Sequence, residues 1–361
     1  MPAPTPPGKV PRAAPGGGGW RALGRFWVVV IILLGGGAAL LQWLGPPARP
    51  TPPPHVAAGA APARQARIAA TLPPRTAGPI APPDPLLLEP APGAPRAMLP
   101  RIGPDGATPM QVYARAFDAG DPRPRIGLVV AGIGESVEES EAAIALPGPV
   151  TLAFSPYTVD PSKLLAEARG KGHEILISLP LEPEGYPLNN PGDEALLVNA
   201  PPEQNLARLD WTLSRIEGYV GATGAMDGMY GERFAAVPSL LDGLERRLAG
   251  RGLLYIDPRA GQPDPAWVTG RTADLVVDVP PVGPAISANL GKLETIAQKR
   301  GSALGVVGWP GPTTIGIVAS WAGTLGAKGL VLVPVTALVR PPTHQAETAP
   351  APGAAESAGN P

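Results

Sequence analysis

The residues of this chain that could carry out chemistry are mainly carboxylates, because other reactive groups are scarce. Among the 361 residues there is no cysteine, which excludes thiol catalysis, disulfide bonds and thiolate metal sites. There are three histidines, and His55 and His344 fall in Pro/Ala-rich stretches, which leaves His173 alone in the central part. A hydrolytic zinc site takes three protein ligands, usually histidines with a carboxylate, so the sequence predicts no catalytic metal and no cofactor.

Two carboxylates stand where an α/β domain places its working groups. Glu182 and Asp257 each follow an apolar run that is typical of a buried strand, and groups at the carboxyl ends of parallel strands face the site. We predict both as candidate acids or bases, with a solvated loop position as the alternative for Glu182. Together with Asp227 and Glu232 they could form an all-oxygen site for magnesium or calcium, although nothing in the spacing requires one.

Asp257 also has a structural interpretation. It is followed at short distance by Arg259, and a carboxylate that is partly withdrawn from water needs a charged or hydrogen-bonding partner. We expect Asp257 to pair with Arg259 or with Arg233 at the end of its strand, and the alternative is an exposed pair in a loop.

Other catalytic patterns are weak. Ser178 or Ser155 with His173 would be the material of a serine hydrolase, but no Gly-x-Ser-x-Gly elbow is present, and a lone histidine at the start of a strand is more often a structural group. The glycine-rich run at 127–134 lacks the Gly-x-Gly-x-x-Gly spacing of a phosphate loop and indicates a tight turn. A net charge of -1 provides no basic face, so nucleic acid is excluded as a partner.

Residues 125–340 alternate between apolar runs and amphipathic runs. Strands are expected at 126–130, 150–154, 175–179, 222–225, 253–256, 275–277, 303–307 and 330–334. Helices are expected at 136–145, 161–170, 202–216, 237–249, 284–300 and 313–325. Repeated β-then-α units require parallel strands joined by right-handed crossovers, so we predict an α/β domain that forms a single (β/α) barrel, either complete or distorted to seven strands.

The N-terminal part predicts a membrane anchor. Residues 1–25 are expected to be a disordered cytoplasmic arm, and Arg21 and Arg25 precede an uncharged run at 26–44, long enough to cross a bilayer as one transmembrane helix. Because the positive residues precede the apolar run, we expect the N-terminus in the cytoplasm and the domain in the periplasm, anchored at the inner membrane. A cleaved signal peptide is the alternative, favoured by the small residues at 35–39 but disfavoured by the length of the run.

The stretches on either side of the domain are rich in proline and alanine. Residues 45–124 are predicted to be an extended linker, and residues 341–361 a disordered tail. The run at 110–117 contains spaced apolar residues and is either a short element docked on the domain or more linker.

Five short motifs stand at or beside the predicted strand ends. They are Ala-Gly-Ile-Gly at 131–134, GHEILISLPLEP at 172–183, GAMDGMYGERF at 224–234, YIDPR at 255–259 and VVGWPGPTT at 306–314. Together they resemble the motifs of the divergent polysaccharide deacetylases, a branch of the metal-dependent carbohydrate esterases. The resemblance implies a carbohydrate substrate, and it extends over nearly the whole predicted domain.

The sequence departs from that family at the positions where the resemblance implies metal ligands and a catalytic base. Aspartates and histidines are replaced there by Ala131, Gly132, Ser178, Met229, Trp309 and Gly311. We therefore predict a pseudoenzyme without the catalytic metal, which binds a cell-envelope polysaccharide or peptidoglycan and is open to envelope protein partners.

The inherited cleft supplies the groups expected to bind that glycan. They are Asp227, Tyr230, Arg233, Arg259 and Trp309, which offer aromatic faces and hydrogen-bonding groups. The alternative is an active carbohydrate hydrolase or deacetylase that works without zinc, with Glu182 and Asp257 as acid and base.

Overall fold

The computed structural model describes residues 78–344. The predicted cytoplasmic arm, the transmembrane run at 26–44, residues 45–77 of the linker and residues 345–361 of the tail lie outside the described residues and stay predictions. Between residues 78 and 344, no helix has the length and apolar character needed to cross a membrane.

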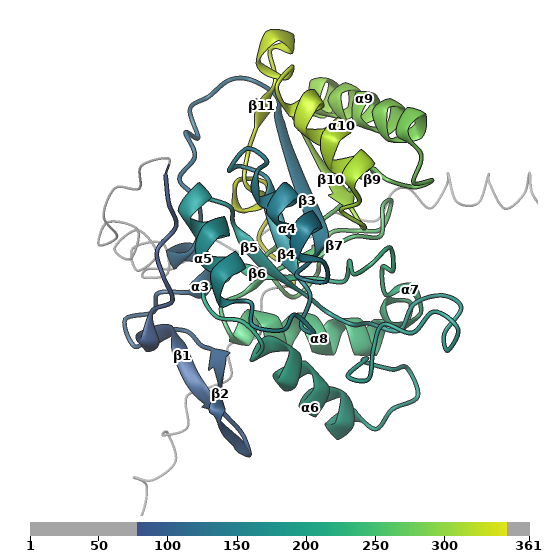
Figure 1. Ribbon diagram of the computed structural model, residues 1–361. Helices are drawn as coiled ribbons and strands as arrows, with labels where there is room; N and C mark the ends of the chain where they lie inside the picture. The colour runs from purple at the N-terminus through teal and green to yellow at the C-terminus, as the bar shows by residue number, and fades with distance from the viewer. Residues whose placement is uncertain (1–77, 345–361) are drawn as a thin grey trace, which may run out of the picture. The chain divides into compact units, whose positions relative to one another are not determined.

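The centre of the domain is a parallel sheet that curls on itself (Figure 1). Its strands are β3 (Arg125–Ile133), β4 (Thr151–Phe154), β5 (Ile175–Ser178), β6 (Gly221–Thr223), β7 (Leu254–Asp257), β8 (Gly270–Thr272), β9 (Leu275–Val276), β10 (Ser302–Val307) and β11 (Val331–Leu332). The order is β8-β7-β6-β5-β4-β3-β10-β9, and β11 pairs with the start of β3. The predicted parallel α/β fold is confirmed. Within the described residues β8 and β9 remain edge strands, so the sheet forms an open half-barrel.

The strand count differs from the seven-stranded form of the predicted barrel, because the described sheet has nine strands. β8 was not predicted from the sequence, since its residues Gly-Arg-Thr form no apolar run. β8 is nevertheless fully paired along β7, where Tyr255 lies opposite Gly270. Backbone pairing along a neighbouring strand positions this short polar segment.

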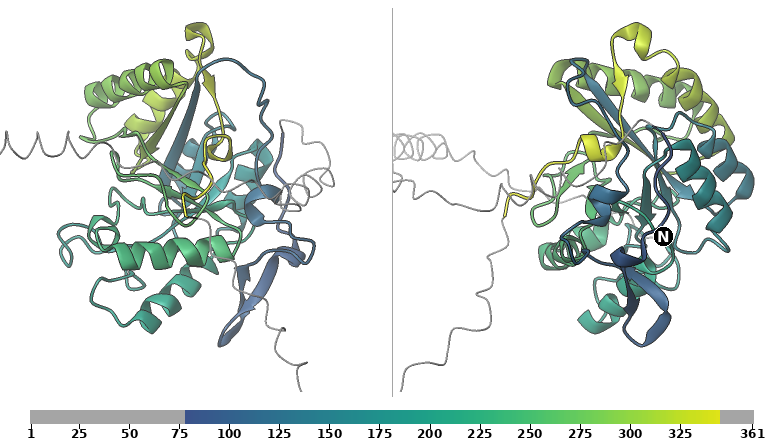
Figure 2. Two further views of the ribbon diagram at one scale, coloured as in Figure 1. Left: turned by 180° about the vertical axis from the view of Figure 1, so that it is seen from behind. Right: turned by 90° about the vertical axis from the view of Figure 1, so that its left-hand side faces the viewer.

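Helices cover the outside of the curved sheet (Figure 2). They are α4 (Val137–Ile144), α5 (Ser162–Lys171), α6 (Pro202–Leu213), α7 (Glu232–Ala235), α8 (Pro238–Gly250), α9 (Gly283–Arg300) and α10 (Pro312–Ala322), with short turns η2 (Gly326–Lys328) and η3 (Val335–Ala337) near the end. The two faces of the sheet bury separate apolar clusters. Leu152 and Phe154 of β4 pack outward with helix residues such as Leu164, whereas Ala153 packs inward with Leu176 of β5.

An N-terminal segment packs against this half-barrel. It contains η1 (Pro85–Leu87), the antiparallel hairpin of β1 (Leu88–Ala91) and β2 (Ala94–Pro100), and α3 (Pro109–Val112). Leu99 and Tyr113 are buried, and the guanidinium of Arg251 donates to the carboxylate of Glu89 and to the carbonyl oxygen of Pro100.

The docked element expected near 110–117 is therefore present as α3 and the buried Tyr113. The predicted linker range of 45–124 needs correction from residue 78 onward, where the chain belongs to the folded domain. Only a few buried side chains anchor this segment to the half-barrel. Because the segment is rich in proline and lacks a periodic apolar pattern, its packing was not predicted from the sequence.

Candidate functional site

The loops that follow β3, β4, β6 and β10 meet at the carboxyl end of the half-barrel, and we call this region the mouth. The clearest contact between them surrounds Gly132. A Cβ atom added to Gly132 would lie 2.9 Å from Cδ of Pro310 and 3.1 Å from Oδ1 of Asp227. Loops from three strands therefore touch one another at this point.

A bulge in β3 creates the space for this contact. The register between β3 and β4 shifts between Val130 and Ile133, and Gly132 has a φ of 77°. Glycine adopts such a backbone conformation without the steric cost that other residues meet. The bulge turns the chain at the end of β3 so that Glu135 follows it immediately at the mouth.

The carboxyl groups of Glu135 and Asp227 are neighbours at the mouth, and Glu135 acts electrostatically on Asp227. Ser155, at the end of β4, donates from its hydroxyl to Oε1 of Glu135 at 2.6 Å. Desolvation within the mouth, and the adjacent Glu135 carboxyl, raise the pKa of Asp227 to about 7, although the residue as a whole is exposed. One proton is therefore shared within this pair near neutral pH, as expected for two carboxyl groups in contact.

A further carboxylate, that of Asp278, holds the loop that carries Trp309. Asp278 accepts hydrogen bonds from the backbone N–H groups of Gly308 at 3.0 Å and of Trp309 at 2.9 Å. The N–H of Gly228 donates to the carbonyl oxygen of Gly308, which joins this loop to the loop after β6. Trp309 is 52% exposed beside the mouth, and Tyr230 lies half-buried against Gly308.

The floor of the mouth carries hydroxyl groups on the inner face of the sheet. Ala153 pairs with Leu176, and both belong to the inner apolar cluster, so the same register places Ser155 beside Ser178 two residues later. Ser178 in turn pairs with Thr223 of β6. The Oγ atom of Ser178 is buried and has no hydrogen-bond partner within residues 78–344.

The two carboxylates predicted as acid and base both have arginine partners. Oε1 of Glu182 lies 3.0 Å from a guanidinium nitrogen of Arg233, and its Oε2 accepts from the backbone N–H of Val198 at 2.7 Å. Asp257 is bound by Arg259 through two hydrogen bonds of 2.6 and 3.0 Å. The expected pairing of Asp257 is confirmed with Arg259, whereas the catalytic roles of Glu182 and Asp257 stay predictions.

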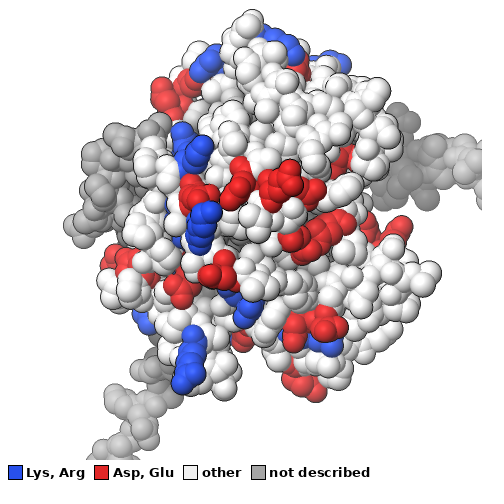
Figure 3. All heavy atoms as spheres, viewed as in Figure 1, with Lys and Arg blue, Asp and Glu red and all other residues white. Residues whose placement is uncertain are grey.

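A pocket of about 540 Å³ lies beside the Asp257–Arg259 pair and is lined by further carboxylates, among them Glu232 and Glu245. Figure 3 shows another concentration of acidic side chains in a band across the face around α4, whose first turn contains Glu138 and Glu139. In the part of the chain that the structure describes, no three carboxylates or histidines form a group able to hold a metal ion.

His173 lies at the opposite end of the sheet from the mouth. It precedes β5, and its ring nitrogens lie 2.7 Å from the carbonyl oxygen of Val150 and 3.0 Å from that of Ile144. Burial lowers its pKa. This is the structural position expected for a lone histidine at a strand start, and it separates His173 from Ser155 and Ser178 at the carboxyl ends.

The metal that the resemblance implies does not fit these residues. Ala131, Gly132 and Ser178 supply no ligand for zinc, and the other described histidine, His344, stacks on Trp267 with ring centroids 4.7 Å apart. Neutral imidazoles and carboxylates are the usual ligands of a hydrolytic zinc. We therefore assign no chemical step at the mouth to a metal.

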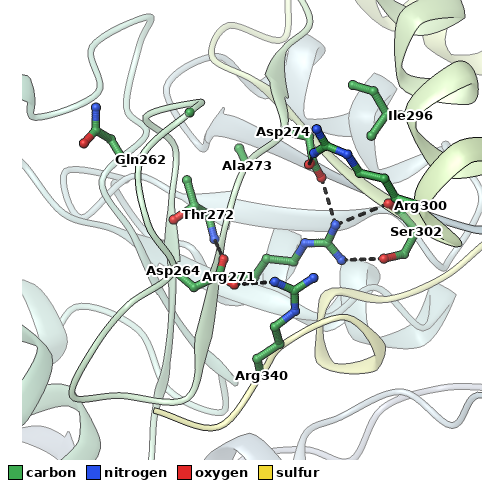
Figure 4. A pocket seen from close by; sticks show the side chains of 11 residues that line it. Gln262, Asp264, Arg271, Thr272, Ala273, Asp274, Ile296, Arg300, Ser302 and Arg340 are labelled. Carbon is green, nitrogen blue, oxygen red and sulfur yellow. Dashed lines mark hydrogen bonds and ion pairs between the residues drawn. The ribbon is translucent and has the colours of Figure 1, made fainter. Parts of the chain in front are cut away.

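The pocket in Figure 4 lies at the amino end of β10 and is separate from the mouth. Its volume is about 480 Å³. Arg271 donates to Asp274 and to the hydroxyl of Ser302, and Arg340 pairs with Asp264. Its arginines are bound to aspartates, so the pocket presents no free cluster of positive charge.

The sequence named Asp227, Tyr230 and Trp309, which the structure brings to the mouth, but it missed Glu135 and Asp278. Glu135 directly follows the glycine turn at the end of β3, which is the signal that could have identified it. Asp278 follows the apolar run that contains β9. Arg233 and Arg259 are occupied by Glu182 and Asp257, and their predicted roles in glycan binding stay untested.

Comparison with known proteins supports the assignment of the fold. The sequence profile of a family described as divergent polysaccharide deacetylase matches residues 128–339. The crystal structure of an uncharacterized protein from Agrobacterium tumefaciens C58 is similar with 34% identity and a TM-score of 0.61, covering 67% of this chain and 100% of that one. No curated protein sequence matches the chain.

Two structures of deacetylases are more distant. One is the catalytic domain of a peptidoglycan N-acetylglucosamine deacetylase from Eubacterium rectale ATCC 33656, with 14% identity, coverage of 63% and 95%, and a TM-score of 0.43. The other is a structure described as T48 deacetylase with substrate, with 14% identity, coverage of 63% and 98%, and a TM-score of 0.41.

Proposed function

The chain belongs to the divergent polysaccharide deacetylase family, and from this premise we propose that it is a glycan-binding member that has lost metal-dependent deacetylation. The ligand class is a cell-envelope polysaccharide or peptidoglycan, and the binding site is the mouth. The protein then acts by holding or locating glycan.

The observation that carries this proposal is the composition of the strand ends. Hydrolysis of the family type requires a metal and a base at the inner ends of the strands, and these ends carry Ala131, Gly132 and Ser178. The single histidine of the central part lies at the opposite ends of the strands. Glu182 and Asp257 are engaged by arginines, so the metal-free hydrolase has no free acid at either predicted position.

The mouth retains groups suited to binding sugars. Trp309 exposes its ring beside the carboxyl ends of the strands, and the apolar faces of sugar rings stack on exposed aromatic side chains. Glu135 and Asp227 provide acceptors for sugar hydroxyl or amine groups. Asp278 fixes the loop backbone at Trp309, which reduces the entropy lost when a ligand orders that loop.

We also propose that the domain faces the periplasm from an anchor at residues 26–44 in the inner membrane. The support is the uncharged run preceded by Arg21 and Arg25. Alkaline phosphatase fused after Leu44 should be active in cells, and an inactive fusion would contradict this topology.

The experiment that tests the function uses the full-length chain, purified in detergent. Chitin oligosaccharides, their de-N-acetylated counterparts and muropeptides are titrated by calorimetry, and acetate release and bound metal are measured on the same samples. We expect binding of at least one glycan, no acetate release and no stoichiometric zinc. Acetate release by a zinc-loaded sample would overturn the proposal, and so would the absence of binding to every glycan.

A further inference from the structure

We propose that the mouth selects sugars that carry a free amine, such as de-N-acetylated hexosamine units, and that the Glu135–Asp227 carboxyl pair holds the ammonium group. This inference rests on the proposed function, glycan binding at the mouth, and specifies its ligand.

The first argument is that, among residues 78–344, this acidic pair has no arginine partner of the kind that the other strand-end acids have. Glu182 is bound by Arg233, and Asp257 is bound by Arg259. The charged groups that act on Asp227 are Glu135 and Glu139, and both are acidic. An external cation is therefore the partner that would complete this pair.

The second argument comes from the floor below the pair and is independent of charge. Ser155 donates its hydroxyl hydrogen to Glu135, while Ser178, beside it on the inner face, is buried with its Oγ unpartnered in the described part of the chain. Leaving a buried hydroxyl without a hydrogen bond is costly. The inner face at the mouth thus offers the Ser178 hydroxyl as a hydrogen-bonding group for a polar ligand.

The third argument concerns the aromatic side of the mouth. Pro310, next to the exposed Trp309, lies against Gly132, and Asp227 lies against the same glycine. The loop that carries Trp309 therefore meets the loop that carries Asp227, and we place a sugar ring stacked on Trp309 on this side of the carboxyl pair.

The substituent on the sugar nitrogen then decides the interaction. An ammonium group offers three donors to the pair, and hydrogen bonds between ionised partners are stronger than neutral ones. An N-acetyl group would bring a carbonyl oxygen, an acceptor, toward carboxyl oxygens, and would add bulk at the same place. The same pair thus attracts the free amine and disfavours the acetylated one.

Binding of the amine should also depend on pH. The carboxyl pair holds a proton below neutral pH, because contact with Glu135 and desolvation favour the protonated form of Asp227. An ammonium ion replaces that proton. The charged groups that act on Asp227 are Glu135 and Glu139. Both are acidic, so they do not reverse the direction of this pH dependence. Affinity for the amine should rise from pH 6 to pH 7.5, and should fall at higher pH when the ligand loses its own proton.

The test compares a β-1,4-linked glucosamine tetrasaccharide with its fully N-acetylated counterpart on the full-length protein, by calorimetry at several pH values. We expect the amine to bind about tenfold or more tightly at neutral pH, as one charge-assisted hydrogen bond would provide. The double variant Glu135→Gln with Asp227→Asn should lose this preference and its pH dependence. Glu138→Gln, which removes an exposed acid from the same region, is the matched control and should retain both.

The outcomes separate this inference from the proposed function. Equal binding of the two tetrasaccharides, or preference for the acetylated one, would overturn the amine selectivity and leave glycan binding intact. A preference that Glu138→Gln abolishes as fully as the double variant does would also overturn it, because the attraction would then be general surface charge. If neither sugar nor any muropeptide binds, the proposed function itself fails. If the double variant is unstable, the comparison of the two tetrasaccharides on the wild-type protein still tests the selectivity for the free amine.

Discussion

Asp227 occupies space that a side chain at Gly132 would need, since its Oδ1 lies 3.1 Å from where a Cβ on Gly132 would stand. The family resemblance implies an aspartate near the end of β3, and in this chain the carboxylate at that place arrives from the loop after β6. Glycine at the bulge and aspartate at 227 are therefore structurally linked. Its neighbour at the mouth is Glu135, which directly follows the bulge in β3.

Replacing Gly132 should destabilise the protein. Gly132→Asp places a side chain at a positive φ and against Pro310 and Asp227, so we expect a loss of about 1 to 3 kcal/mol in the free energy of unfolding. Thermal unfolding measures the change. Gly243→Ala in α8 is the control, because a Cβ there meets nothing within 4 Å and alanine favours a helix. A Gly132→Asp variant as stable as the control would contradict the contact.

Asp257→Asn should lower the melting temperature by several degrees. The substitution leaves Arg259, which donates two hydrogen bonds to this buried carboxylate, without its ionic partner, and breaking a buried pair costs about 3 to 5 kcal/mol. Glu141→Gln, which removes an exposed pair with Lys163, should change the melting temperature much less. Equal melting temperatures for the two variants would argue that Asp257 is not held by this pair, and would restore it as a candidate acid.

Glu174 should make stability fall as the pH rises toward neutral. It is buried at the amino end of β5, where its carboxylate accepts hydrogen bonds from the backbone N–H of Arg115 and from the N–H and hydroxyl of Thr336. Burial raises its pKa from 4.5 to about 7. The folded state therefore holds a proton that the unfolded state has released between these values, and the stabilisation present below pH 4.5 is lost progressively up to about pH 7.

Glu174→Gln removes that proton uptake. Denaturant unfolding from pH 4.5 to pH 7.5 should show a flatter stability curve for the variant than for the wild type, by on the order of 3 kcal/mol across this interval. Asp227 titrates in the same range in both proteins, so the difference between the curves isolates Glu174. Parallel curves would show that Glu174 titrates as an ordinary carboxyl group.

Trp309→Ala should weaken glycan binding without changing stability. The ring is 52% exposed, and its removal takes away a stacking surface while leaving the apolar core intact. A loss of about 1 to 3 kcal/mol in binding free energy, with an unchanged melting temperature, is expected from the usual contribution of an aromatic contact at a binding site. Leu86→Ala, at another exposed apolar residue in η1, should not affect binding. Binding that survives the loss of Trp309 would place the glycan elsewhere.

The sequence by itself determined the repeating architecture and the main chemical exclusion. Apolar runs followed by amphipathic runs predicted most of the parallel strands and helices, because burial between helices makes such strands apolar throughout. The motifs at the strand ends pointed to the correct family. The absence of cysteine excludes a thiolate site, and a single histidine in the central part is too few for the usual ligand set of a hydrolytic zinc.

Only the tertiary structure decided how the carboxylates are used. The sequence predicted an arginine partner for Asp257, but it did not predict that Arg233 binds Glu182 or that Asp227 meets Glu135. That meeting depends on the curl of the sheet and on the bulge at Gly132, and neither leaves a periodic pattern in the sequence. Docking of residues 78–124 likewise depends on a few long-range contacts rather than on local propensity. Pairing between groups distant in the chain follows from the geometry of the strand ends, and only the folded arrangement specifies it.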